Sequence, residues 1–118
     1  MQYLCLVYHD ERQLGTLGQD ECDALAGEAL AYDRELRQSG HHIAAAALQV
    51  ARTATILRVR GGAVGLTEGP YAETREQLRG FLLIEARDLN DAIRIAAKIP
   101  GARVGCVEVR PVQDPLAP

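Results

Sequence analysis

Hydrophobic and polar positions alternate along the chain in distinct ways, and each way predicts a different element. Residues 3–8 form an unbroken apolar run, which is typical of a strand covered on both faces. Between Gly18 and Gly40 the apolar residues recur every three or four positions, as on one face of an amphipathic helix. These residues are Cys22, Leu25, Ala26, Ala29, Leu30 and Leu36. The chain is therefore predicted to begin with a buried strand and a helix that packs on it.

Two more strands are predicted after this helix, at residues 43–50 and 54–60. The second of them alternates, with Leu57 and Val59 on one side. Gly61-Gly62 follows and is a hairpin turn signal, so residues 63–67 should pair back on the preceding strand. This pairing predicts an extra hairpin arm in the middle of the chain.

The second half of the chain repeats the order of strand, helix and strand. Residues 80–86 form a strongly apolar strand, and Asp88 is a suitable cap for the helix that follows. Pro100-Gly101 should stop that helix, and residues 103–110 alternate as a last strand. The tail at 113–118 is rich in proline and has no packing pattern.

The order of these elements predicts a single α+β domain over residues 1–112. The order is strand, helix, two strands with the arm, strand, helix and strand, or βαββαβ. Helices cannot cover both faces of the sheet in so short a chain, so an antiparallel sheet with two helices on one face is the economical solution. This is the ferredoxin-like arrangement, which places the first and last strands side by side.

The other face of the predicted sheet requires a cover. The first strand is apolar on both sides, and a monomer would expose an apolar surface larger than soluble monomers usually tolerate. A homodimer that packs sheet against sheet provides the cover. The alternative is that the arm and the proline-rich tail fold over this face.

Charge and composition narrow the classes of partner and site. The net charge of −3 argues against a cationic surface for nucleic acid. The amino terminus lacks the features of a signal peptide and no apolar run approaches the roughly 20 residues that span a bilayer, so a cytoplasmic protein without membrane contact is expected. Cys5, Cys22 and Cys106 show no CxxC spacing, which favours buried or half-buried thiols over a disulfide or zinc site. Cys22, on the first helix, is the candidate reactive thiol.

A pair of adjacent histidines, His41 and His42, follows the first helix. Two imidazoles can bind a metal, but no third ligand stands at a suitable spacing. Histidines at a helix carboxyl end also interact favourably with the helix dipole. No metal and no cofactor are therefore predicted.

The stretch LTEGPYAETREQLRGFLLIE, residues 66–85, is the most distinctive in the chain. Together with LCLVYHDE, TATILRVRGG and IPGARVGCVEVRPV, it resembles the YCII-related family, and in particular its DGPF branch, over essentially the whole chain. That branch usually carries Asp-Gly-Pro-Phe followed by Ala-Glu-Thr-Lys-Glu. Here Glu68 stands for the acid, Tyr71 for the aromatic and Arg75 for the base, so each replacement keeps the chemical type.

The resemblance implies a dimeric ferredoxin-like α+β barrel, similar to muconolactone isomerases and small cofactor-free monooxygenases. It implies less about activity, because most DGPF proteins have no assigned reaction. Some members of the wider family resemble enzymes with a His and Asp pair, which does not align with the histidines of this chain. DGPF genes often lie beside alternative sigma factors.

The candidate acid or base is His9, at the end of the first strand. Neighbouring residues on a strand point to opposite faces, so Asp10 is not expected to bond His9. The acids considered as its orienting partner are Asp33 on the first helix, Glu68 and Glu73. The alternative is a solvated histidine at a strand end.

Four further residues are predicted to bind a ligand: Tyr8, Arg58, Tyr71 and Arg110. Arg58 can hold a carboxylate in a partly buried cavity. Arg58 and Arg110 can instead form ion pairs at the rim of a dimer, and the tyrosines can serve packing alone. The Gly69-Pro70 turn and the acids beside it have a structural alternative too, as a clasp in which a carboxylate such as that of Glu73 accepts backbone N–H groups.

Two functions remain open from the sequence. The first is a dimer that binds a small apolar or lactone-like molecule between helices and sheet, with cofactor-free acid and base chemistry at His9. The second is a non-catalytic dimeric module that binds a ligand or a protein, in a response linked to a sigma factor.

Overall fold

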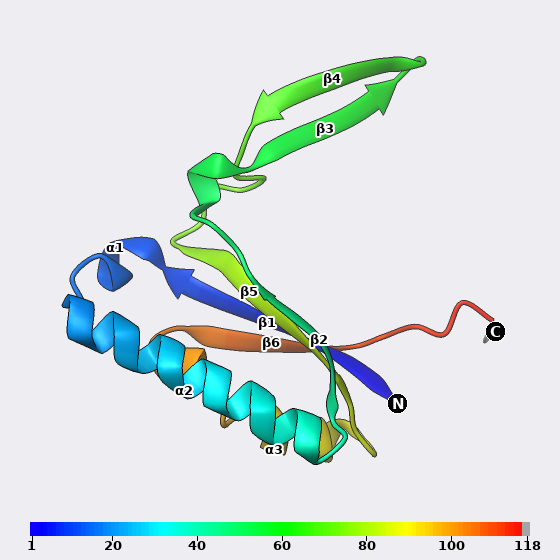
Figure 1. Ribbon diagram of the computed structural model, residues 1–118. Coiled ribbons are helices and arrows are strands. Elements are labelled where there is room, and N and C mark those ends of the chain that lie inside the picture. The colour runs from blue at the N-terminus through cyan, green and yellow to red at the C-terminus, as the bar shows by residue number, and fades with distance from the viewer. Residues whose placement is uncertain (117–118) are drawn as a thin grey trace.

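Four strands form one antiparallel sheet in the computed structural model, which describes residues 1–116 (Figure 1). They are β1 (Gln2–Asp10), β2 (His42–Ala47), β5 (Glu76–Glu85) and β6 (Cys106–Pro111). Their order across the sheet is β2-β5-β1-β6, so the first and last strands of the chain pair with each other. This is the predicted α+β ferredoxin-like fold.

Two helices, α2 (Gln19–Gln38) and α3 (Leu89–Ala96), cover one face of the sheet (Figure 1). The core lies between that face and α3 together with the end of α2. Its fully buried side chains include Cys5, Ile84 and Ile95. As expected, Asp88 caps α3, and its carboxylate accepts the backbone N–H of Asp91 at 2.8 Å.

Some boundaries differ from the predicted ones. A short helix α1 (Glu11–Leu14) directly follows β1, because the side chain of Asp10 accepts the N–H of Arg12 and caps it. The 3-10 turn η1 (Ala51–Thr53) follows β2, which ends at Ala47. The last strand begins at Cys106 because Pro100 starts a second 3-10 turn, η2 (Pro100–Arg103).

The arm consists of β3 (Thr55–Arg60) and β4 (Ala63–Glu68), and it forms a separate two-stranded sheet. Gly61 and Gly62 both have positive φ, at 57° and 78°, which the tight hairpin turn requires. The arm projects beyond the end of the main sheet (Figure 1). The prediction of an extra hairpin is thus confirmed.

The face of the sheet opposite the helices carries no further layer of the described chain (Figure 1). Within residues 1–116, no helix is both long enough and apolar enough to cross a membrane. Residues 117 and 118, the end of the predicted tail, lie outside the described residues.

Candidate functional site

A cleft lies between α2 and the sheet because α2 is anchored at few places. Leu36, near its C-terminal end, is its only buried residue. The hydroxyl of Tyr32 donates to the carbonyl of Ile95 at 2.6 Å, and Glu28 pairs with Arg103. The rest of the helix stands away from the sheet and leaves a cavity of about 390 Å³. A volume of this size lies within the range typical of small-molecule sites.

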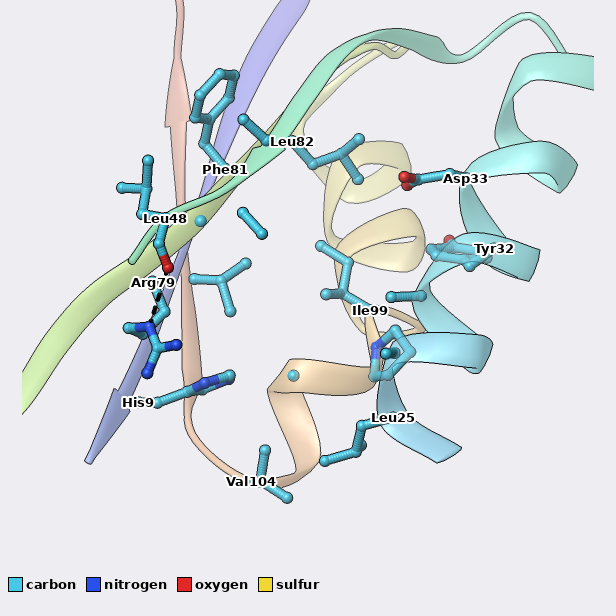
Figure 2. Close-up of a pocket in the computed structure, with 18 of the residues that line it drawn as sticks. His9, Leu25, Tyr32, Asp33, Leu48, Arg79, Phe81, Leu82, Ile99 and Val104 are labelled. Carbon is cyan, nitrogen blue, oxygen red and sulfur yellow. Dashed lines mark hydrogen bonds between the residues drawn. The ribbon is translucent and has the colours of Figure 1, made fainter. Parts of the chain in front are cut away.

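The walls of the cleft are mostly apolar, and Figure 2 shows them with the polar side chains that interrupt them. The apolar residues come from the sheet, from α2 and from η2. The polar side chains gather at two places, His9 and Arg79 at one end and Asp33 with Tyr32 on the wall formed by α2. The apolar lining includes Val7, Leu14, Leu25, Ala26, Ala29, Leu48, Leu82, Ile99 and Val104.

His9 lies at the end of β1 on the face that meets the helices, as the alternation of β1 requires. Its ring packs against two glycines of the segment before β6. A Cβ added at Gly101 would lie 2.9 Å from Nε2 of His9, and one added at Gly105 would lie 2.6 Å from Cδ2. Only glycine at these positions leaves room for the imidazole.

Burial changes the acidity of His9. It lowers the pKa of the imidazole below the ordinary 6.5, and the positive charge of Arg79 lowers the pKa further. The backbone of Gly101 and the carboxylate of Glu76 oppose this shift. Nε2 of His9 is buried and has no hydrogen-bond partner in the described chain. The imidazole is therefore neutral at neutral pH and able to accept a proton.

Arg79 enters the cleft because of a β-bulge. Val7 pairs with Gly80 and Tyr8 pairs with Leu78, so Arg79 is passed over in the pairing of β1 and β5. An extra residue of this kind bends a strand and re-aims its side chain. Arg79 consequently lines the same cavity as His9 (Figure 2).

Two contacts hold the guanidinium of Arg79. Its Nε donates to the carbonyl oxygen of Leu48 at 3.3 Å, and its Nη1 lies 3.9 Å from Oε1 of Glu11. The same oxygen of Glu11 accepts the backbone N–H of Ala51 at 2.8 Å. The side chain of Arg79 is 25% exposed, so it is partly buried.

Of the acids predicted as partners of His9, only Asp33 lies in the cleft. It occupies the wall formed by α2, across the cavity from His9 (Figure 2), and no hydrogen bond joins the two within the described residues. Glu68 is exposed on the arm, and Glu73 is exposed in the connection between β4 and β5. The structure therefore does not bring Glu68 or Glu73 to His9.

The predicted ligand-binding residues do not line the cleft either. Arg58 is exposed on the arm, because strand alternation indicates a face of a strand but not the sheet that the strand joins. Tyr8 and Arg110 lie on the opposite face of the sheet, where the hydroxyl of Tyr8 donates to Glu108 at 3.2 Å. Burial, followed by that hydrogen bond, raises the pKa of Tyr8. Tyr71 is 81% exposed at the edge of a second, open hollow that Tyr8 also lines.

The clasp, which we define as residues 69–77, joins the arm to β5. The cis peptide bond between Gly69 and Pro70 starts it, and the N–H of Gly69 donates to Ala54 at 2.7 Å. The side chain of Gln77 then donates to the carbonyl oxygens of Ala72 and Thr74 at 2.9 and 2.8 Å. The clasp is thus held by an amide side chain, and no hydrogen bond of the Glu73 carboxylate occurs in the described part of the chain.

Arg79 is the site residue that the sequence reasoning missed. A bulge is not visible in hydrophobic alternation, but two signals precede this one. A charged residue interrupts an apolar strand, and Gly80 follows it directly. A Cβ at Gly80 would lie 2.9 Å from the carbonyl oxygen of Ala46, so the neighbouring strand requires glycine there.

The thiols only partly follow expectation. Cys5 is buried, and burial raises its pKa to about 11, but Cys22 and Cys106 are exposed. Cys22 is exposed because α2 stands off the sheet, and it lines the cleft. Among residues 1–116, no three His, Cys, Asp or Glu side chains come together in a way that could hold a metal ion.

Comparison with known proteins gives the chain a family. The model of the YCII-related domain matches residues 1–115. An uncharacterized protein of Rhizobium meliloti (strain 1021) is 32% identical over 114 residues, which cover 95% of this chain and 92% of that protein. The relative thus extends the similarity without adding an activity. The chain belongs to the YCII-related domain family.

Proposed function

We propose that the cleft binds a small, mostly apolar or lactone-like molecule, and that His9 exchanges a proton with it. The observation that carries the proposal is the half-buried imidazole of His9 at the end of an apolar cavity of about 390 Å³. Solvated histidines at strand ends lack such a cavity. A reaction of this kind needs no cofactor.

The position of His9 supports a role as a base. Its Cδ2 and Nε2 atoms pack against Gly105 and Gly101, and Nδ1 lies on the other edge of the ring. Burial and Arg79 keep the ring neutral, which leaves one nitrogen free to accept a proton. The imidazolium formed could then return the proton to another carbon of the same molecule. Asp33, on the facing wall, would attract that imidazolium.

Binding is tested with the lactone coumarin as the probe, by NMR titration of backbone amides. Saturable shifts should appear at amides that border the cleft, such as those of Leu82 and Gly101. Ala29→Phe should abolish them, because Ala29 lines the cleft, whereas Ala31→Phe, on an exposed part of the same helix, should not. No saturable shift in the unsubstituted protein would refute the binding site.

Proton exchange is tested with α-angelica lactone, whose conversion to the conjugated β isomer removes a proton from C3 and returns one to C5. General base catalysis typically contributes about 10²-fold or more in rate. His9→Gln should therefore lower the rate at least tenfold while coumarin still binds. Equal rates for the two proteins, or none above the uncatalysed rate, would exclude this chemistry.

We further propose that the protein is a homodimer through the open face of the sheet, meaning the face opposite α2 and α3. A second observation supports this assembly. On the arm, Leu57 pairs with Leu66 and Val59 with Val64, so the four side chains share one face of the ribbon. They are 59%, 67%, 52% and 63% exposed in the same order. We call these four residues the arm stripe.

A two-stranded ribbon is marginal in water without an apolar partner surface. The open face of the sheet is apolar too, with Leu4, Leu6 and Phe81 only partly covered. A second copy offers both surfaces at once, because a twofold axis makes each chain donor and acceptor of the same contacts. The proposed occupant of the arm stripe is therefore a second copy of this chain.

Sedimentation velocity tests the assembly. The unsubstituted protein should be dimeric at micromolar concentration, and Leu66→Glu should shift it to a monomer. Thr67→Glu places the same charge on the other face of the same strand and should leave the dimer intact. A monomeric unsubstituted protein would contradict the proposal, as would a Leu66→Glu variant that stays dimeric.

The competing function is a non-catalytic module that binds a ligand or a protein partner, with the clasp as its surface. A solid clasp with no hollow behind it would favour that function, but Pro70, Tyr71 and Thr74 line an open hollow. We therefore prefer the cleft. Membership in the DGPF branch, a cytoplasmic location and a link to sigma factors stay predictions.

A further inference from the structure

Arg79 has spare hydrogen-bonding capacity inside the cleft. A guanidinium has five N–H donors, and here Nε serves Leu48 while Nη1 lies 3.9 Å from Glu11. At that separation the carboxylate of Glu11 compensates the charge only in part, and its Oε1 already accepts the N–H of Ala51. A partly buried cation whose one ion pair within the described chain is 3.9 Å long can accept a further anion.

The backbone determines where the side chain of Arg79 points. The bulge at Arg79, opposite Val7 and Tyr8 of β1, aims its side chain to the helix side of the sheet, and the bond to Leu48 holds it there. His9 lies beside it at the same end of the cavity (Figure 2). An anionic group bound to Arg79 would thus lie next to the imidazole.

The remaining walls restrict the rest of the ligand. They are apolar except for the wall formed by α2, where Asp33 is the charged residue and the Tyr32 hydroxyl is already bonded to Ile95. The carboxylate of Asp33 disfavours a second anionic group at that wall. The cavity therefore suits one anionic group attached to an apolar body.

We propose that Arg79 binds the carboxylate of a small apolar monocarboxylate and so sets the substrate class of the cleft. This inference rests on the proposed function, since it concerns the same cavity. The bidentate geometry of a guanidinium matches a carboxylate, which a neutral amide of equal shape cannot imitate. The role of Arg79 is therefore specificity, and His9 remains the proton acceptor.

Binding of a carboxylate should also act on His9. The positive charge of Arg79 helps to keep the imidazole neutral, so a carboxylate that compensates this charge should favour the protonated ring. Glu76 on β5 opposes the effect of Arg79 on the ring, and the other ionisable groups of the cavity wall are Cys22, Tyr32 and Asp33 on α2. Glu11, whose Oε1 lies 3.9 Å from Nη1 of Arg79, competes with the bound carboxylate for this charge.

The test compares two probes of one shape, 2-naphthoate and 2-naphthamide, by isothermal titration calorimetry. The full-length protein should bind the carboxylate at least tenfold more tightly than the amide, and increasing salt should reduce that difference. Arg79→Gln should lower the affinity for the carboxylate to that of the amide, with the affinity for the amide unchanged. Naphthalene-2,6-dicarboxylate should bind more weakly than 2-naphthoate because of Asp33.

The control variant is Arg75→Gln. Arg75 is 86% exposed outside the cleft, where its Nε lies 3.6 Å from Asp10, and its loss should change the affinity for 2-naphthoate less than twofold. If Arg79→Gln does not fold, Glu11→Gln provides the second variant. Removing the competing carboxylate should strengthen binding of 2-naphthoate several-fold and leave 2-naphthamide unaffected.

The outcomes separate the two proposals. Equal affinities for the two probes, with no effect of either Arg79→Gln or Glu11→Gln, would overturn the role of Arg79 and leave the cleft intact as a binding site. Failure of both probes to bind would overturn the cleft itself. A dicarboxylate that binds as tightly as 2-naphthoate would overturn the restriction to one anionic group.

Discussion

His9 couples the stability of the fold to pH. Its pKa in the folded protein is below the 6.5 of an unfolded chain, so the unfolded state binds more protons between these two values. The contribution of the neutral imidazole to stability is therefore complete above pH 6.5, and it is lost as the pH falls through the pKa of the folded state. We expect His9→Gln to lose less stability than the unsubstituted protein between pH 7 and pH 5, as measured by urea unfolding. Identical losses would show that the imidazole is not destabilised when charged.

Asp91 also couples stability to pH, but in a more acidic range than His9. Its side chain is 1% exposed, accepts the N–H of Arg87 at 3.0 Å and pairs with Arg94 at 2.8 Å. The backbone N–H first, and Arg94 second, hold the pKa of this carboxyl well below its usual value. A depressed pKa contributes stability above the unfolded value near 3.8, and that stability is lost as the pH falls into the acid range.

Asp91→Asn should consequently lower the thermal midpoint at pH 7, and the difference from the unsubstituted protein should shrink below pH 4. Asp20→Asn, an exposed acid in the first turn of α2, is the matched control and should have little effect. Differential scanning calorimetry at several pH values measures both. A difference that does not depend on pH would mean that the charge of Asp91 is not what stabilises α3.

Among the elements, the clasp has a strict steric requirement at Gly69. A Cβ at Gly69 would lie 2.7 Å from Cβ of Ala54 and 3.1 Å from its carbonyl oxygen, so the segments must separate to admit it. Gly69→Ala should destabilise the protein by about 1–3 kcal/mol, as overpacking does. It should also speed amide exchange at the base of the arm.

Gly65→Ala serves as the control for this variant. Gly65 lies in the middle of β4, and the nearest atom to its added Cβ is the carbonyl oxygen of Arg58 at 3.7 Å, an ordinary contact. It should unfold at the same urea concentration as the unsubstituted protein, or slightly higher. Equal destabilisation by both variants would remove the clasp as a structural explanation of the motif.

The elements also show how far the sequence predicts this molecule. Apolar periodicity was sufficient for the four sheet strands, the two long helices and the arm, because each follows a period of two or near 3.6. It also placed His9 at the end of the first strand, where the residue lines the cleft, while the role of His9 stays a prediction. Periodicity does not predict the position of Arg79, because a bulge shifts this residue to the other face of the sheet. It does not predict the position of Arg58 either, because alternation does not indicate which sheet a strand joins.

At the scale of the whole molecule, the single chain is more extended than its length requires. Its radius of gyration is 16.3 Å, whereas a compact chain of this length would have about 13.5 Å. The arm contributes to the difference, since it projects beyond the sheet without packing on it (Figure 1). The cleft lies on the helix side of the sheet, opposite the face that we propose a second copy covers.

An NMR titration of the His9 imidazole tests the central claim most directly. The pKa read from this one signal depends on the burial of His9 in the cleft, on the charge of Arg79 and on whether a carboxylate is bound. His9→Gln assigns the Cε1–H resonance, which is then followed against pH with and without saturating 2-naphthoate. We predict a pKa below 6.5 in the free protein and a higher pKa when the probe is bound. A pKa at or above 6.5 that does not respond to 2-naphthoate would contradict the claim that this cleft binds an apolar carboxylate beside His9.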